Sequence, residues 1–245
     1  MTATLLLKNA LVIGTMDDQL RELANASVFI RGNKVEAVGP ASELPSEADK
    51  VIDMTGHVLI PGLINTHHHM FQSLTRALPA AQNAELFDWL TALFPVWQNI
   101  TPAMQRAATR TAMAELMLSG CTTAADHAYL YVNGTRLDDS VQAAEEMGMR
   151  FHAVRGAMSL GQSQGGLPPD ALVEQDEQAI LREMQRVVED LHDSAADAMI
   201  KVALGPCSPF TVTTDLMREG AALARSCGVG LHTHTAENVK DLAFS

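Results

Sequence analysis

The chain has 245 residues, of which 47% are hydrophobic and 19% are charged, and its formal net charge is −12. This composition is typical of a globular protein with a sizeable core. The acidic balance argues against a nucleic-acid partner, because phosphate binding requires clustered Lys and Arg. The cysteines Cys121, Cys207 and Cys227 are too scattered for a disulfide framework and form no CxxC pair for a thiolate zinc site.

The N-terminus and the apolar runs show no sign of export or of a membrane anchor. No basic segment precedes the short apolar run within residues 1–8, so this segment does not read as a signal peptide. No uninterrupted apolar stretch approaches the ~20 residues that a membrane helix needs. We therefore expect a cytoplasmic protein without a membrane partner.

Short strands separated by turns fill the first part of the chain. The expected strands are residues 4–8, 10–13, 26–31 and 34–38. Gly32-Asn33 separates the last two and indicates a hairpin. Residues 1–58 are predicted to form a small β unit that is too short to be an independent catalytic domain.

After Pro61-Gly62, strands and helices alternate. The expected strands are residues 58–65, 122–127, 150–155, 199–204 and 230–234. The expected helices are residues 86–93, 102–119, 137–147, 171–192 and 214–226, the last two capped by Asp170 and Thr213. Such alternation predicts a parallel sheet with helices outside it, which fits an open doubly wound sheet or a closed (β/α)₈ barrel.

The number of strands limits the barrel interpretation. The chain after Pro61 is shorter than the roughly 250 residues of a full barrel, and it contains five expected strands instead of eight. The final segment, Glu237–Ser245, reads as the beginning of a further helix. We therefore expect an incomplete barrel, truncated after its fifth strand.

Two pairs of histidines mark opposite ends of this region. His67 and His69 follow the apolar run Val58–Ile64, and His232 and His234 lie in the last expected strand. Residues i and i+2 share one face of a strand, so each pair presents two imidazoles to the same side. One such pair is a weak signal, since a core histidine is usually structural. Two pairs at strand ends predict a metal site.

A polar residue stands three positions after each pair: Gln72 after His69 and Glu237 after His234. Glu237 has the wrong parity to share the face of His234, so the strand must end near His234. A carboxylate at the mouth of the site can take a proton from the attacking water and give it to a leaving nitrogen. The Gln72 amide can hydrogen-bond a planar heterocycle as both donor and acceptor.

These motifs resemble those of the amidohydrolase superfamily, in its cytosine/guanine deaminase and triazine hydrolase branch. The resemblance extends over the whole chain and rests on Pro61–His69, Ser119–His127 and His232–Glu237. Other segments resemble those of 8-oxoguanine deaminases within this branch: His68–Arg76, Arg155–Leu160 with Gly165–Pro169, and Pro206–Phe210.

The resemblance implies a metal-dependent-hydrolase TIM (β/α)₈ barrel. Here the barrel is incomplete, with about five βα units in residues 59–245, and residues 1–58 are the N-terminal part of a small β-sandwich domain. His67, His69 and His234 are implied to bind one divalent metal ion, Zn²⁺ in most such deaminases, with Fe²⁺ as the alternative. Family members also use a histidine after strand six and an aspartate after strand eight. These positions lie outside this chain, so we expect weak metal affinity and little turnover from it alone.

The resemblance also implies roles in a reaction on a small heterocyclic substrate. Glu237 is the implied proton shuttle, Gln72 the implied contact to a purine ring, and His127 and Cys207 are further candidates for substrate contact, with packing roles as the alternative. The implied reaction converts 8-oxoguanine and water to urate and ammonia, and the full-length protein is expected to be a homo-oligomer. Deamination of guanine, cytosine or pterins, triazine deaminase or chlorohydrolase activity, and a catalytically incompetent fragment stay open.

Several neighbouring residues have a structural and a functional interpretation. His232 is expected to support the site rather than bind metal, and Asp126 can orient His127 by a hydrogen bond. Phe87, Trp89 and Trp97 are expected in the core, with a lid over the substrate as the alternative.

Gly161-Gln-Ser163-Gln-Gly165 matches the G-x-S-x-G pattern of serine hydrolases. A nucleophile elbow passes directly into a helix, and the Pro168-Pro169 that follows cannot do so. We do not expect a serine nucleophile here. A deaminase of the P-C-x-x-C class is excluded, because Pro206-Cys207 lacks the second cysteine.

Overall fold

The structure is a computed structural model that describes residues 2–244. Contacts divide the chain into two compact units, the first ending at Gly62 and the second beginning at Leu63. Strand β5 (Val58–Leu59) belongs to the first unit because it pairs in parallel with strand β1 (Thr4–Gly14). The division therefore lies four residues beyond the predicted one at residue 58.

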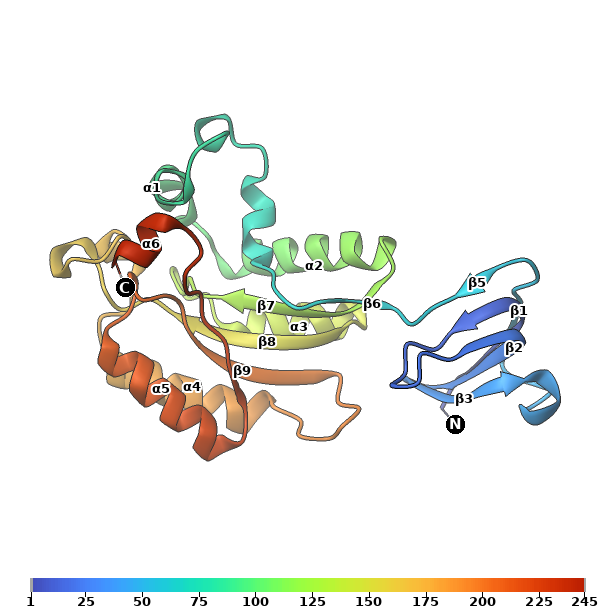
Figure 1. The fold of residues 1–245 in the computed structure, drawn as a ribbon. Helices are drawn as coiled ribbons and strands as arrows, with labels where there is room; N and C mark the ends of the chain where they lie inside the picture. The colour runs from blue at the N-terminus through green and yellow to red at the C-terminus, as the bar shows by residue number, and fades with distance from the viewer. Residues whose placement is uncertain (1, 245) are drawn as a thin grey trace. The chain divides into compact units, whose positions relative to one another are not determined.

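The first unit is built on one mixed sheet, drawn in blue in Figure 1. Its other strands are β2 (Glu22–Arg31), β3 (Lys34–Pro40) and β4 (Lys50–Asp53), in the order β3-β2-β1-β4, and the short turn η1 (Ala41–Glu43) follows β3. Two strands were predicted where β1 is continuous. The chain bulges at Asn9, whose φ of 64° suits an asparagine, and the register with β2 shifts between Leu7 and Ala10.

The second unit is a curled sheet of parallel strands, as predicted. The strands are β6 (Leu63–Asn65), β7 (Cys121–Ala128), β8 (Arg150–Ala157), β9 (Ile200–Pro206) and β10 (Gly230–Leu231), in the order β10-β9-β8-β7-β6. Each of the three longest strands is followed by a helix that packs on the sheet. The alternation of strand and helix read from the sequence is therefore present.

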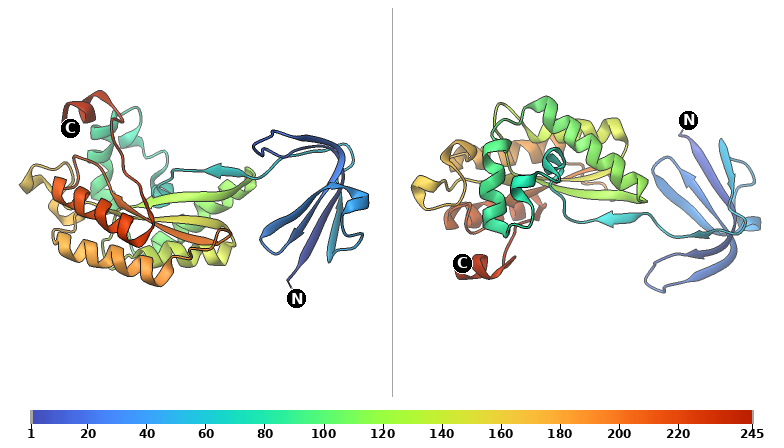
Figure 2. Two further views of the ribbon diagram at one scale, coloured as in Figure 1. Left: turned by 60° about the horizontal axis from the view of Figure 1, so that its bottom comes forward. Right: turned by 90° about the horizontal axis from the view of Figure 1, so that it is seen from above.

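Four helices pack on this sheet and cover its outer side (Figures 1 and 2): α2 (Pro102–Leu118), α3 (Leu137–Met147), α4 (Glu177–Leu191) and α5 (Thr214–Cys227). Two further helices, α1 (Leu86–Trp97) and α6 (Val239–Phe244), lie beyond the carboxyl ends of the strands (Figure 1). Short 3₁₀ turns complete the unit: η2 (Met70–Thr75), η3 (Pro79–Ala81), η4 (Gln162–Gln164) and η5 (Asp170–Leu172). Among residues 2–244, none of the helices has the length and apolar character to cross a membrane.

Three predicted elements were wrong in their bounds. The strand predicted over residues 230–234 ends already at Leu231, so His232 and His234 lie beyond it. The single strand predicted over residues 58–65 is split into β5 and β6, because Pro61 between them has no N–H to donate to a ladder. The helix predicted from residue 171 begins at Glu177, and its cap is Asp176, whose side chain accepts from the Ala179 N–H. Thr213 does cap α5, as predicted, by accepting from the Leu216 N–H.

A hydrophobic core between the sheet and helices α2, α3 and α4 fixes the strand ends in place. Met113, Leu137, Phe151 and Val202 are among its fully buried members. Burial of each such large side chain contributes roughly 1.5–3 kcal/mol. The carboxyl ends of the strands, where the chain turns into loops, are thereby held at fixed separations.

Candidate active site

The candidate site lies at the carboxyl ends of the parallel strands, the edge at which barrel enzymes place their chemistry. Each strand is followed within a few residues by a side chain of the site. These are His67 and His69 after β6, Tyr129 after β7, Met158 after β8, Cys207 after β9, and His232 and His234 after β10. The convergence predicted from strand-end spacing is therefore present, although the histidines lie just beyond the strands instead of within them.

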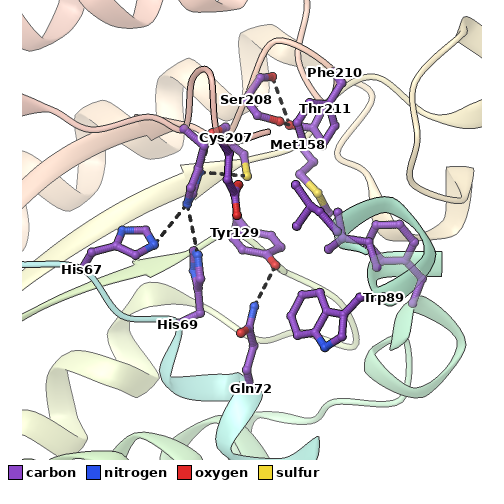
Figure 3. Close-up of a pocket in the computed structure, with 15 residues that line it drawn as sticks. His67, His69, Gln72, Trp89, Tyr129, Met158, Cys207, Ser208, Phe210 and Thr211 are labelled. Carbon is purple, nitrogen blue, oxygen red and sulfur yellow. Dashed lines mark hydrogen bonds between the residues drawn. The ribbon is translucent and has the colours of Figure 1, made fainter. Parts of the chain in front are cut away.

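Three histidine rings meet at this edge (Figure 3). The Nε2 atom of His234 lies 3.1 Å from Nε2 of His69 and 3.3 Å from Nε2 of His67. One ligand nitrogen from each ring can be chosen so that all lie within 4.8 Å of one another. The chain thus brings together the three residues predicted as metal ligands.

The end of β7 holds the segment that carries His69. The His127 N–H donates to the His68 carbonyl at 2.8 Å, and the His69 Nδ1–H donates to the His127 carbonyl at 2.7 Å. The Met70 N–H donates to Asp126 Oδ1 at 2.7 Å. We expected Asp126 to orient His127, but its side chain instead accepts from the backbone directly after His69. Burial raises the pKa of Asp126 to about 7.

The end of β9 holds His234 in a similar way. The Cys207 carbonyl accepts both the His234 N–H at 2.9 Å and the His234 Nδ1–H at 2.7 Å. A ring that donates through Nδ1 to a carbonyl keeps its lone pair on Nε2. His69 and His234 are therefore both fixed in the tautomer that leaves Nε2 as a ligand atom.

This arrangement fits a bound cation. Burial lowers the pKa of His67 to about 4 and that of His69 to about 3, so both rings are neutral at pH 7. Two Nε2 lone pairs 3.1 Å apart repel each other. A tetrahedral zinc ion with Zn–N distances of about 2.0–2.1 Å sets its nitrogens about 3.3–3.4 Å apart, close to the observed separations.

A second group of potential ligands, His127, Cys207 and His234, fits a metal ion less well. Burial raises the pKa of the Cys207 thiol to about 12, which disfavours the thiolate that a metal requires. His234 already uses Nδ1 to donate to the Cys207 carbonyl. The histidine trio of His67, His69 and His234 is therefore the better candidate for a metal site.

His127 and His232 lie next to that trio, and His232 contacts both His127 and His67 of the trio through its ring nitrogens. His232 Nδ1 lies 2.7 Å from His127 Nδ1, and His232 Nε2 lies 3.4 Å from His67 Nδ1. The His127 ring is fully buried, and a Cβ atom added to Gly156 or Gly205 would come within 3.0 Å of it. His127 is not among the residues that line the pocket described next, so the structure favours its packing role over substrate contact.

A cavity of about 170 Å³ opens beside the histidine trio. Its wall includes Gln72, Cys207 and Glu237, three of the residues predicted for the site. The rest of the wall is mostly apolar and comes from α1 and from the loops after β7, β8 and β9: Leu86, Trp89, Leu90, Phe94, Tyr129, Met158, Ser208, Phe210 and Thr211. A flat apolar ring with a few polar edges suits such a wall.

The aromatic residues near the cavity have different roles. Trp97 is fully buried and its Nε1–H donates to Thr75 Oγ1 at 3.0 Å, so it is a core residue, as expected. Phe87 packs against Phe210 with a ring-centroid distance of 5.0 Å. Trp89 lines the cavity, which agrees with the lid alternative for that residue.

Ser163 is not placed as a nucleophile. It lies in η4, and its Oγ donates to Asp170 Oδ1 at 3.0 Å instead of to a histidine. Asp170, predicted as a helix cap, is thus engaged within its own loop.

Sequence reasoning missed Tyr129 and Met158 as parts of the pocket wall. Their residue types are common in cores, but both directly follow a strand, and that position was the available signal.

Histidines gathered at the carboxyl ends of parallel strands define a metal-binding α/β protein of the hydrolase-barrel type. The chain belongs to the amidohydrolase family, which residues 58–243 match. The predicted family and fold class, an incomplete barrel with a curled parallel sheet, are thereby confirmed.

Relatives of known activity lie in the predicted branch. The chain is 43% identical over 240 residues to 8-oxoguanine deaminase from Pseudomonas aeruginosa, covering 97% of this chain and 53% of that protein. It is 35% identical over 230 residues to hydroxydechloroatrazine ethylaminohydrolase from Pseudomonas sp. strain ADP, covering 88% of this chain and 47% of the relative. The chain spans about half the length of the curated relatives it matches.

Solved structures show the same architecture. Atrazine chlorohydrolase from Arthrobacter aurescens TC1, in complex with zinc, superimposes with a TM-score of 0.88 at 30% identity, covering 96% of this chain and 53% of that one. A triazine hydrolase variant gives a TM-score of 0.90 at 30% identity, with 99% and 55% covered.

Proposed function

We propose that this chain carries the metal-binding half of a hydrolase that removes an amino group from a purine-like heterocycle. The observation that carries the proposal is the approach of the His69 and His234 Nε2 atoms to 3.1 Å in tautomers that leave both lone pairs free. We propose Zn²⁺ as the ion held by His67, His69 and His234, with Fe²⁺ as the alternative. When bound, such an ion supplies a Lewis acid that makes water nucleophilic at neutral pH.

Glu237 is the proposed general base and acid. It lines the same cavity as His67, His69 and His234, and its side chain is exposed at the mouth. Its N–H donates to Asp241 Oδ2 at 2.9 Å, which holds the backbone at this position. The carboxylate takes the proton of the attacking water and delivers it to the departing amine.

8-Oxoguanine is the proposed substrate. The similarity to the Pseudomonas aeruginosa deaminase supports it, as do the apolar wall around Trp89 and Phe210 and the amide of Gln72. Water adds to the ring carbon that bears the amino group, the carbon–nitrogen bond breaks, and the products are urate and ammonia. Gln72 and Cys207, both on the wall, are the proposed substrate contacts.

A single-turnover assay tests this proposal. The zinc-loaded chain is held in excess over 8-oxoguanine, and ammonia and urate are quantified over time. We expect slow release of both products in equal amounts. Guanine, cytosine, isoxanthopterin and an aminotriazine, tested in the same way, show whether the substrate is 8-oxoguanine or a related ring.

The matched variants are Glu237→Gln and Glu145→Gln, the latter an exposed carboxylate on α3. Loss of the general base is expected to slow ammonia release by about 10²–10⁴-fold while the zinc content stays the same. Glu145→Gln should behave like the wild type. Unchanged release by Glu237→Gln, or no release from any of the five rings by the zinc-loaded wild type, would contradict the proposal.

A further inference from the structure

Tyr129 is part of the cavity wall, and its ring is held in place by packing. It directly follows β7 and is only 5% exposed. Its ring meets Phe71 edge-on, with centroids 5.1 Å apart and planes at 89°, and meets His69 at 5.0 Å and 81°. Such contacts from two sides hold the aromatic ring, so the position of its hydroxyl is set by packing.

The hydroxyl of Tyr129 pairs with Gln72 beside Trp89 (Figure 3). Gln72 Nε2 donates to Tyr129 Oη at 3.2 Å. This is the one side-chain hydrogen bond that either residue makes within residues 2–244, so the Tyr129 O–H and the Gln72 Oε1 remain for a ligand. The pair therefore presents one donor and one acceptor side by side on the cavity wall.

The Tyr129 hydroxyl is buried, and it can donate its proton to a ligand while it accepts from Gln72 Nε2. A buried donor without a partner is costly, which makes a ligand acceptor at this position favourable.

One acceptor next to one donor complements a lactam, in which a ring N–H stands beside a C=O. We propose that Tyr129 is a specificity-determining residue, which together with Gln72 selects heterocycles whose amino-bearing carbon is adjacent to a lactam. The N–H donates to Gln72 Oε1, and the carbonyl accepts from the Tyr129 hydroxyl. This inference rests on the proposed function, because it concerns the substrate of the same site.

A 2-aminopurine ring without the lactam offers a nitrogen lone pair where the lactam offers N–H. Gln72 Oε1 would then face a second acceptor, and Tyr129 would lose its carbonyl partner.

The test compares the binding of two ligands, 8-oxoguanine and 2-amino-8-oxopurine, which differ in the N1–H/C6=O lactam beside the amino-bearing carbon. Affinities for the zinc-loaded chain are measured by quenching of the tryptophan fluorescence, to which Trp89 on the cavity wall contributes together with Trp97. The wild type is expected to prefer 8-oxoguanine. In Tyr129→Phe, which keeps the ring, the affinity for 8-oxoguanine is expected to fall about five- to tenfold, as for the loss of one hydrogen bond, while that for 2-amino-8-oxopurine changes less than about twofold.

Tyr131→Phe is the matched control, because the Tyr131 hydroxyl donates to the Ala128 carbonyl at 2.9 Å and Tyr131 does not line this cavity. It should leave both affinities unchanged. An equal preference for 8-oxoguanine in Tyr129→Phe and the wild type would overturn the inference, as would failure of the wild type to bind either ligand. Selective binding without ammonia release would instead count against the proposed function and leave the recognition by Tyr129 standing.

Discussion

The Nε2 atoms of His69 and His234 lie 3.1 Å apart, although each ring directs its only N–H toward a backbone carbonyl. No hydrogen bond joins two nitrogens that both lack a proton, and burial disfavours the protonation of His69 that would supply one. A shared cation would turn this repulsion into coordination. The two carbonyls, of His127 and Cys207, hold both rings in the tautomer that such a cation would require.

Removal of one of the three proposed histidine ligands should weaken zinc binding further. We expect His69→Gln and His234→Gln each to weaken zinc affinity by more than the ~10–100-fold that is typical of losing an outer hydrogen-bond partner. His57→Gln, at an exposed histidine of the first unit, is the control and should match the wild type. Competition with a chromogenic chelator measures the affinities, and equal values for all four chains would refute the assignment.

The thiol of Cys207 should be dispensable for metal binding. His234 is held by the backbone carbonyl of Cys207, and the Sγ atom lies 3.8 Å from His234 Nδ1. We therefore expect Cys207→Ser to keep its zinc affinity within about twofold of the wild type, since that carbonyl bond is retained. A large loss in the same chelator competition would show that sulfur is a ligand.

Gly205 should be required for the packing of His127. An added Cβ would lie 2.6 Å from Val154 Cγ1 and 2.9 Å from the His127 ring. Such overpacking typically costs about 1–3 kcal/mol, so the urea midpoint of Gly205→Ala should fall. Gly230→Ala is the control, because its Cβ would meet Ala203 at an ordinary 3.8 Å. Similar urea midpoints for both variants would mean that the space between Gly205, Val154 and the His127 ring is not tightly packed.

Asp126 should make the stability of the metal-free chain depend on pH. The folded chain keeps the Asp126 proton up to about pH 7, whereas the unfolded chain releases it near the ordinary value of 3.8. Between these values the folded state binds more protons, so this residue lowers stability as pH rises. Asp126→Asn cannot ionise, so its stability relative to the wild type should improve from pH 5 to pH 8. If the urea midpoints of Asp126→Asn and of the wild type change in parallel between pH 5 and pH 8, the raised pKa of Asp126 would be contradicted.

The sequence was most informative about site residues that directly follow the predicted strands. The spacing of His67, His69 and His234 after apolar runs was enough to predict that they meet, because parallel strands bring their carboxyl ends to one edge. The same logic placed Gln72 and Glu237 at the cavity, where the structure has them.

The contacts that orient these residues could not be predicted, because they join positions far apart in the chain. The bond from Met70 to Asp126 depends on the exact register of the loop after β6 against β7. Tyr129 has a residue type that usually packs in cores, and its place in the cavity wall depends on contacts with Phe71, His69 and Gln72, which are distant in sequence. Asp170 looked like a helix cap, but Ser163 engages its side chain.

The most direct test of the account is an anomalous-diffraction map of the zinc-soaked chain, recorded at the zinc absorption edge. The account predicts one strong peak at bonding distance from nitrogens of His67, His69 and His234, with Zn–N distances of about 2.0–2.1 Å. A peak bound instead by Cys207 and His127, or no peak near His69 and His234, would contradict it.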